Sequence, residues 1–120
     1  MKIYVTGLGV VSGIGIGVSE NIEALRQRKH GIGKVTLFPT ALDVPVSEVK
    51  RSNEELKKLI SLPPQRTVSR TALLGMIAAK EAMKDAGLTP PLRIGFISAT
   101  SVGGMDLSEH FYDCLLYTSP

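Results

Sequence analysis

Hydrophobic and polar positions along the chain fall into short apolar runs, which predict strands, and longer periodic segments, which predict helices. Residues 3–11 are almost continuously apolar, and residues 93–100 combine the apolar Ile94, Phe96 and Ile97 with small residues. A short continuous run of this kind is typical of a strand covered on both faces. We therefore expect two buried strands, placed as neighbours in a mixed sheet.

The strongest helical pattern covers residues 69–86. Its first half is apolar or small all round, and its second half is amphipathic. Gly87 follows and supplies a helix stop. A helix that is apolar on nearly every side is buried, so we expect this one to pack against a sheet or another helix.

A shorter helix is expected to begin with Ser19 as its N-cap. A serine at this position can accept hydrogen bonds from the free N–H groups of the first turn. Helical spacing puts three apolar residues on one face of it. They are Val18, Ile22 and Leu25.

Ser52 and Glu55 have the spacing of a capping box, which predicts another short helix after an extended, looping stretch at residues 33–49. A last helix is expected from Asp106 or Ser108. The resulting order of strand, helix, small helix, helix and strand indicates an α/β layered fold.

Composition supports a folded domain and limits its partners. The chain has 120 residues, of which 43% are hydrophobic and 21% charged, and this suffices for one small domain with a core. A net charge of +3 suits an acidic partner but is no nucleic-acid-binding signature. Neither a membrane span nor a signal peptide is recognisable, so we expect a cytoplasmic protein.

Cys114 is the single cysteine, which excludes an internal disulfide and a zinc site built from several thiolates. His30 and His110 lie far apart in the sequence, so we expect no metal site. A nucleophilic cysteine needs a base or a helix N-terminus to lower its pKa, and the sequence around Cys114 offers neither. We expect no catalytic role for this residue.

The glycine-rich residues 6–17 have two interpretations. They could cradle a dinucleotide phosphate, as in an NAD(P)-dependent dehydrogenase, or they could form a strand and turn packed too closely for side chains. Thr6-Gly7 and Gly13-Ile14-Gly15 are separated by five residues, whereas the dehydrogenase pattern needs three. Close packing is therefore the favoured interpretation, and the dehydrogenase is the weaker alternative.

Two further features each have a functional and a structural interpretation. Residues 98–104 lie at the C-terminal end of the second predicted strand, where α/β folds bind ligands, but they also suit an ordinary strand-to-helix turn. A basic set of residues could form a docking patch for an acidic protein or a solvated face. Its members are Lys50, Arg51, Lys57, Lys58, Arg66 and Arg70.

Three blocks of the sequence resemble the β-ketoacyl-acyl carrier protein synthases. Residues 6–12 resemble the opening signature of that family, residues 69–88 its first long core helix, and residues 93–105 the strand and glycine-glycine loop that follow. The resemblance covers residues 1–113 and implies a thiolase-like α/β fold, in which each of two duplicated halves is a mixed sheet between helices. The chain would be a partial N-terminal half, and residues 114–120 a non-native tail.

The resemblance also implies a reaction. Such enzymes take an acyl chain from acyl carrier protein onto a cysteine, decarboxylate malonyl-acyl carrier protein and join the two in fatty acid or polyketide synthesis. They work as homodimers on acyl and malonyl thioesters and need no cofactor. The family's cysteine motif and its histidine motifs would lie beyond residue 113, so this fragment is expected to hold no catalytic residue and to be inactive alone. A chain-length-factor-like partner, which keeps the fold and loses the cysteine, is the alternative.

Four positions carry the family's site roles by resemblance. Val102, which precedes Gly103 and Gly104, matches a position that lines the acyl pocket and gates entry of the chain. Arg66 matches a basic position that docks acyl carrier protein. The family's other basic residues beside it are replaced here by Pro63, Pro64 and Thr67, which weakens the predicted docking. With only part of a sheet, the isolated fragment is expected to be poorly stable.

Overall fold

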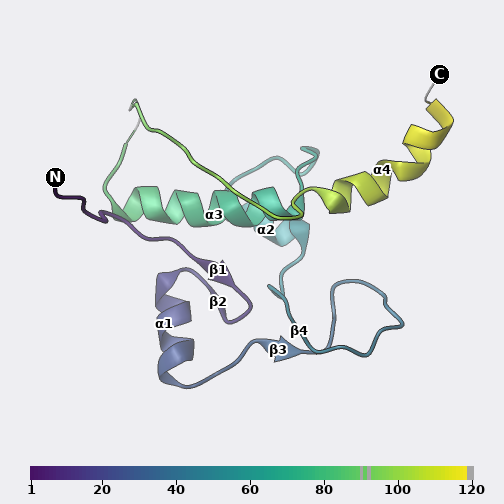
Figure 1. Cartoon of the computed structure of the whole chain (residues 1–120), viewed down its shortest axis with the longest axis horizontal. Helices are drawn as coiled ribbons and strands as arrows, with labels where there is room; N and C mark the ends of the chain where they lie inside the picture. Colours follow the sequence, from purple (N-terminus) through teal and green to yellow (C-terminus); the bar gives the residue numbers. More distant parts are fainter. Residues whose placement is uncertain (90, 92, 119–120) are drawn as a thin grey trace.

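The computed structural model describes residues 1–89, 91 and 93–118, which form four helices and two small antiparallel sheets (Figure 1). The first sheet pairs β1 with β2, and the second pairs β3 with β4. The elements are β1 (Val11–Ser12), β2 (Gly15–Ile16), α1 (Val18–Arg26), β3 (Ile32–Gly33), β4 (Val46–Ser47), α2 (Asn53–Leu59), α3 (Arg70–Asp85) and α4 (Met105–Thr118).

Helix α3 packs against α2 and the β1–β2 hairpin, and its predicted limits are confirmed. Ser69 is the N-cap, and its side chain accepts the N–H of Ala72 at 3.2 Å. Ala86 is the C-cap, and Gly87 follows with a φ of 66°, a conformation that glycine adopts without a Cβ penalty. Local capping signals therefore set both ends of this helix.

The predicted capping box of α2 is also confirmed. The Ser52 side chain accepts the N–H of Glu55 at 3.2 Å, and the Glu55 carboxylate accepts the N–H of Ser52 at 2.8 Å. Two N–H groups that the helix itself cannot satisfy thus gain partners.

The prediction for α1 is wrong at its start, and the apolar face of this helix is not its buried face. Gly17, not Ser19, is the N-cap. Two of the three residues on the apolar face are exposed, Ile22 to 43% and Leu25 to 66%. Asn21 is buried instead, and its amide donates to the carbonyl oxygens of Gly15 and Gly17 at 2.9 and 2.8 Å. This polar contact fixes the helix against the β1–β2 hairpin.

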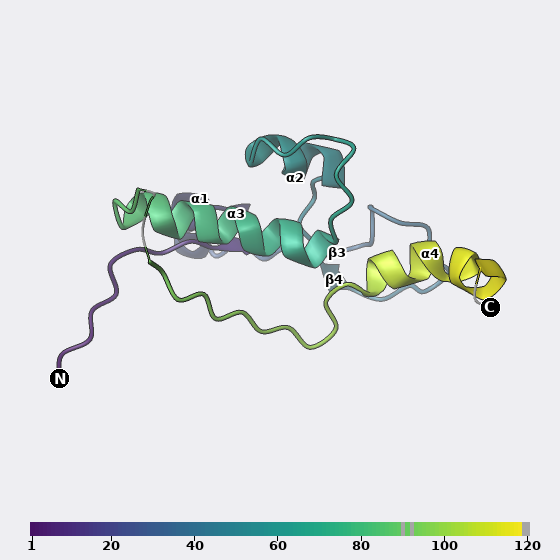
Figure 2. The same ribbon diagram turned by 90° about the horizontal axis from the view of Figure 1, so that it is seen from above.

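The mixed sheet predicted for residues 3–11 and 93–100 is not formed by the described part of the chain. Of both runs, only Val11 lies in a strand, and Ile3 and Ile97 are 83% and 99% exposed. Residues 3–9 and 93–100 have no neighbouring strand among the described residues, and a strand needs one for its backbone hydrogen bonds. Residues 93–104 run back from the C-terminal end of α3 to its N-terminal end (Figure 2).

The core is small and lies where α2, α3 and the β1–β2 hairpin meet. Leu56 and Leu73 are fully buried, and Ile77 is nearly so. Partly buried apolar residues surround them, including Val11 and Ile16 from the hairpin. Helix α3 is therefore buried along one stripe only, and not on nearly every side as its composition predicts.

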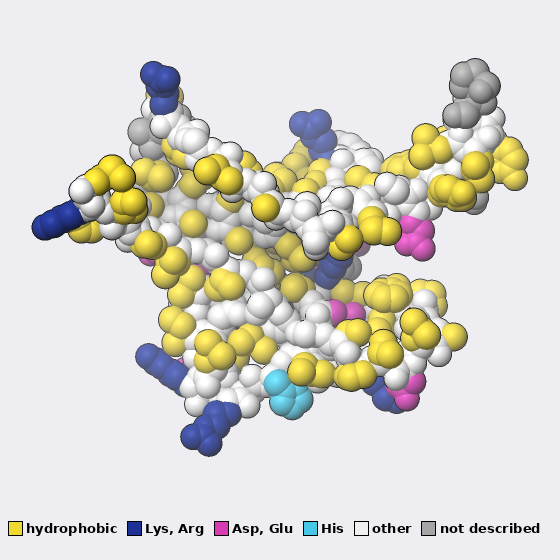
Figure 3. Space-filling model, viewed as in Figure 1, with side chains coloured by type: hydrophobic (Ala, Val, Ile, Leu, Met, Phe, Trp, Pro, Cys, Tyr) yellow, Lys and Arg dark blue, Asp and Glu magenta, His cyan; other side chains and the backbone are white. Residues whose placement is uncertain are grey.

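Much apolar surface remains exposed. The accessible surface is 10006 Å², whereas a compact monomer of 12.9 kDa exposes about 6,300 Å². The radius of gyration is 17.2 Å, against about 13.6 Å for a compact domain of 120 residues. Hydrophobic side chains cover much of the projecting α4 and of the extended segments (Figure 3).

Candidate functional site

The glycine-rich segment is bound to α3 by carboxylates of that helix. The N–H of Leu8 donates to Asp85 at 2.9 Å, and the N–H of Val10 donates to Glu81 at 3.0 Å. The second oxygen of Glu81 accepts the N–H of Val18, the first residue of α1, at 2.8 Å. These N–H groups are therefore already satisfied by the protein's own anions and are not directed at a phosphate.

The glycines of this segment allow its backbone to lie close to α3. A Cβ atom at Gly7 would overlap the backbone of α3 at Ala82 and Ala86. The interpretation that the segment is packed too closely for side chains is thus confirmed. The arrangement gives no support to a dinucleotide site in residues 6–17.

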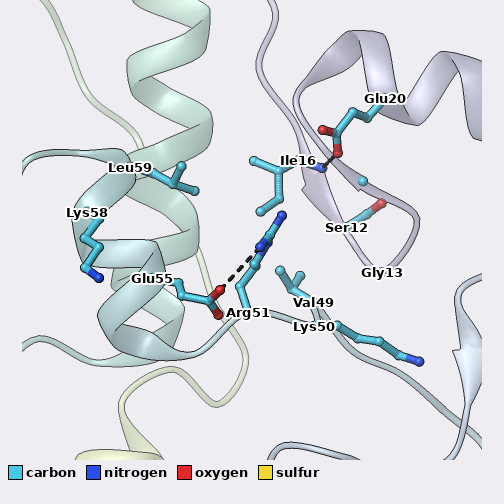
Figure 4. Close-up of a pocket in the computed structure, with 11 residues that line it drawn as sticks. Ser12, Gly13, Ile16, Glu20, Val49, Lys50, Arg51, Glu55, Lys58 and Leu59 are labelled. Atoms are coloured by element: carbon cyan, nitrogen blue, oxygen red, sulfur yellow. Dashed lines mark hydrogen bonds and ion pairs between the residues drawn. The ribbon is translucent and has the colours of Figure 1, made fainter.

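A cleft of about 790 Å³ separates the β1–β2 hairpin from α2. Arg51 projects into it, between Ile16 of the hairpin and Glu55 of α2 (Figure 4). The Arg51 guanidinium and the Glu55 carboxylate form an ion pair at 3.3 Å. The pKa of Glu55 is lowered, first by the hydrogen bond from the N–H of Ser52 and then by Arg51, so this carboxylate stays charged in the cleft.

The predicted basic set does not form one continuous docking surface. Lys50, Arg51 and Lys58 line the cleft. The side-chain ammonium of Lys57 instead donates a hydrogen bond to the carbonyl oxygen of Pro64 at 2.7 Å. The remaining two members, Arg66 and Arg70, lie elsewhere and differ in their surroundings.

Arg66 is exposed in the turn between α2 and α3, where its backbone N–H donates to Pro63 at 3.0 Å. Its side chain is therefore accessible to a partner. Arg70 is committed to the fold instead. Its guanidinium donates to the carbonyl oxygens of Val49 at 2.6 Å and Arg51 at 3.0 Å, and to Asn53 Oδ1 at 2.9 Å.

Val102, Gly103 and Gly104 form an exposed loop just before α4, which we call the substrate loop after the role predicted for it. Val102 is 67% exposed and lies outside the cleft. Gly104 has a φ of 89°, and its carbonyl oxygen accepts the N–H of Leu107 at 3.1 Å, which starts the helix. Within the described part of the chain, the side chain of Val102, which is predicted to line the acyl pocket, is therefore exposed to solvent.

The substrate loop and the turn of Arg66 are linked at the N-terminus of α3. Asp106, in the first turn of α4, accepts the backbone N–H of Arg70 through Oδ2 at 2.7 Å. The sequence predicts Asp106 only as a possible helix start, and it predicts neither this contact nor those of Glu81. The signal available in the sequence was an acidic residue two positions after the glycine pair, at the start of a predicted helix.

The sequence predicts neither a nucleophilic cysteine nor a metal site in this chain. Cys114 is exposed and lies in the C-terminal half of α4, away from the positive end that would stabilise a thiolate. Over the described ranges, no three acidic, histidine or cysteine side chains are grouped so as to hold a metal ion. None of the helices in this part of the chain is long and apolar enough to cross a membrane.

Comparison with known proteins gives a consistent match. Residues 1–113 match the family model described as the N-terminal domain of beta-ketoacyl synthase. A 3-oxoacyl-(acyl-carrier-protein) synthase 2 of Coxiella burnetii is 32% identical over 99% of this chain and 30% of its own length. Nodulation protein E of Rhizobium meliloti is 30% identical over 96% of this chain and 29% of its own length.

A 3-oxoacyl-(acyl-carrier-protein) synthase 2 of Staphylococcus aureus is 27% identical over the whole of this chain and 30% of its own length. The chain therefore spans about 30% of the length of the curated relatives that it matches. No solved structure shows a significant match.

Proposed function

The chain belongs to the beta-ketoacyl synthase family, through its N-terminal domain, and on that premise we propose that it is part of a condensing enzyme. The reaction is the decarboxylative condensation of an acyl thioester with malonyl-acyl carrier protein. The observation that carries the proposal is the match over residues 1–113 in a chain of 120. Relatives named as 3-oxoacyl-(acyl-carrier-protein) synthases give the reaction its substrate class.

In this proposal the chain supplies structure and substrate contacts, and the nucleophile lies in sequence beyond residue 113. Condensation needs a thiolate at neutral pH, and a thiolate is stabilised at a helix N-terminus or beside a cation. The position of Cys114 in α4 meets neither condition. The chain alone is therefore inactive.

Two contacts with substrate are assigned to this chain. The substrate loop takes part in the acyl pocket, where the small Gly103 and Gly104 allow close approach and the apolar Val102 faces the acyl chain. Arg66 docks the acidic carrier protein from its exposed turn. Lys50 and Lys58 at the cleft, apart from Arg66, add to the positive charge of the chain and favour encounter with an acidic partner.

The exposed apolar segments support the view that the chain works within a larger assembly. Residues 3–5 and 94–97 are extended, apolar and mostly exposed. Such segments have unpaired backbone groups and would gain most from pairing with further strands. We infer that these segments are covered by the remaining sequence of the synthase and by a second copy in a homodimer.

The test is to read the coding sequence past codon 113 and assay the protein that it encodes. We expect a Thr-Ala-Cys-Ser-like motif, two later histidine motifs and the release of CO2 with formation of 3-oxoacyl-carrier protein. An intact protein with the cysteine motif but without condensing activity would overturn the proposal. A continuation that lacks the cysteine would assign the chain to a non-catalytic, chain-length-factor-like partner.

A further inference from the structure

We propose that Asp106 is a positioning residue that fixes the substrate loop to the N-terminus of α3, and that Arg70 joins this anchor to the segment of residues 49–53 beside the cleft. The inference rests on the proposed function for the role of the loop. The anchor itself rests on hydrogen bonds between residues of this chain. It would make Asp106 a determinant of acyl-chain selection without any contact with the acyl group.

The first step is the bond between Asp106 and Arg70. Asp106 Oδ2 accepts the backbone N–H of Arg70 at 2.7 Å, across 36 positions of sequence. Arg70 is the first residue of α3, and its N–H is one of those that the helix cannot satisfy internally. A carboxylate at this place gains both a charge-assisted hydrogen bond and the favourable field of the helix N-terminus.

The second step is the short distance along the chain between that bond and the substrate loop. Gly104 precedes α4 with a φ of 89°, and its carbonyl oxygen accepts the N–H groups of Leu107 and Ser108 at 3.1 and 3.2 Å. Asp106 lies inside this turn. Fixing the Asp106 side chain to α3 therefore also fixes the turn in which Gly104 lies.

The third step is that packing does little to hold the loop. Val102 and Met105, the apolar residues on either side of the glycine pair, are 67% and 64% exposed. Burial of apolar area is the usual means of holding a loop in place, and here it is small. The hydrogen bond to Arg70 is therefore a main restraint on the loop.

The fourth step concerns the other side of Arg70. Its guanidinium donates to the carbonyl oxygens of Val49 and Arg51 and to Asn53 Oδ1, so one residue holds the segment that leads into α2. Its backbone N–H at the same time holds Asp106. Arg66, the proposed docking residue, lies in the turn immediately before α3. The N-terminus of α3 thus joins the docking side of the chain to the substrate loop.

The anchor is tested by amide hydrogen exchange in the synthase that contains this chain, followed by mass spectrometry of short overlapping peptides. In Asp106→Ala we expect the Arg70 amide and the amides of residues 103–108 to exchange at least about tenfold faster, because a charge-assisted bond is lost. Asp106→Asn keeps an oxygen acceptor without the charge and should give an intermediate increase of about two- to fivefold. Glu109→Ala, a change on the same helix that leaves the bond to Arg70 intact, is the matched control, and its exchange rates should equal those of the unsubstituted protein.

Protection of the Leu73 and Ile77 amides reports whether the core survives each change. If the core of Asp106→Ala unfolds, the test rests on Asp106→Asn alone. An exchange rate of the Arg70 amide that is unchanged in Asp106→Asn would then overturn the anchor. An unprotected Arg70 amide in the unsubstituted protein would overturn it as well. Equal rates in Asp106→Ala and Glu109→Ala would do the same.

The positioning role is tested in the synthase that contains this chain. Asp106→Ala should change the ratio of kcat/KM for long over short acyl thioesters at least about threefold, and Asp106→Asn should restore most of it. An unchanged ratio, with the anchor shown by exchange, would overturn the role in acyl selection. Absence of condensation in the unmodified synthase would instead overturn the proposed function and leave the exchange result standing.

Discussion

Gly9 lies so close to α3 that a Cβ atom at this position would overlap the carbonyl oxygen of Ala78. The absence of a side chain lets the backbone of residues 7–10 lie directly along the helix. Only at that separation can the N–H of Val10 reach the carboxylate of Glu81 at 3.0 Å. A close backbone approach and a carboxylate acceptor thus replace the strand pairing that the apolar pattern of this segment predicts.

Gly9→Ala should detach this segment from α3. The added methyl has no space against the helix backbone, and overpacking of this kind costs about 1–3 kcal/mol. We expect the Val10 amide to exchange about tenfold faster or more, measured by NMR. Gly75→Ala is the matched control on α3, since a Cβ there meets nothing within 4 Å, and it should stabilise the helix by about 0.5–1 kcal/mol.

If Gly9→Ala and Gly75→Ala gave the same exchange rate at Val10, the close approach of residues 7–10 to α3 would be refuted.

Glu81 and Asp85 should differ in importance, although both bind the N-terminal segment. Glu81 is partly buried and accepts two N–H groups, from Val10 and Val18, whereas Asp85 is exposed and accepts one, from Leu8. Glu81→Ala leaves two N–H donors without acceptors, at about 1–3 kcal/mol each when they are buried. We expect faster exchange at Val10 and Val18, and a fall in thermal stability larger than that of Asp85→Ala.

A larger effect of Asp85→Ala than of Glu81→Ala would show that residues 8–18 are held mainly at their outer end. Asp43→Ala, in an exposed loop, serves as the control for removal of a carboxylate.

The elements predicted well from the sequence are those set by neighbouring residues. Ser69 and Gly87 define α3, and Ser52 with Glu55 defines the start of α2, because a cap acts within a few positions of the chain. The exposed turn of Arg66 could be expected from the prolines around it. These features need no knowledge of the rest of the fold.

The elements predicted wrongly depend on partners that are distant in sequence. Helix α1 begins after Gly17 because Glu81 of α3 accepts the N–H of Val18, and nothing near Ser19 reveals that carboxylate. The apolar runs predict strands, but a strand forms only where another backbone is available for pairing. The anchor at Asp106 is hidden for the same reason, since Arg70 lies 36 positions away.

The pKa of Glu55 should depend more on a backbone N–H than on the neighbouring arginine. The hydrogen bond from Ser52 is the first cause of its lowering and Arg51 a later one. Ser52→Pro removes that N–H at a residue whose φ of −68° suits proline, so we expect the pKa to rise toward its ordinary value of 4.5. Arg51→Ala should raise it less, as measured by NMR titration of the Glu55 carboxyl carbon.

Ser52→Ala is the control, because it removes the hydroxyl and keeps the N–H. The sign for stability follows from the lowered pKa: the carboxylate of Glu55 stabilises the start of α2 above pH 4.5 and ceases to do so as the pH falls through the lowered value. An equal pKa in Ser52→Pro and Ser52→Ala would exclude the backbone donor as the cause.

Arg66→Glu should weaken binding of acyl carrier protein to the synthase that contains this chain. Reversing one exposed charge at the rim of an interface mainly slows association, and we expect KM for the carrier-bound substrate to rise about three- to tenfold with kcat nearly unchanged. The effect should shrink as salt is added, because exposed charges are screened. Lys29→Glu, an exposed charge reversal after α1, is the control, and an equal rise in KM there would show a general field effect and no docking role for Arg66.

The isolated chain should self-associate and melt with low cooperativity. Among the described residues the fully buried large side chains are Leu56 and Leu73, while Phe96 and Ile97 are 77% and 99% exposed. A core of this size offsets little of the conformational entropy that folding removes, and the extended apolar segments can pair with those of another copy. Sedimentation velocity should show the mean mass rising with concentration, and the thermal transition should be broad. Lysine substituted at Phe96 and Ile97 together should reduce association without lowering the melting temperature, whereas a sharp transition from a strictly monomeric chain would show that these segments need no cover.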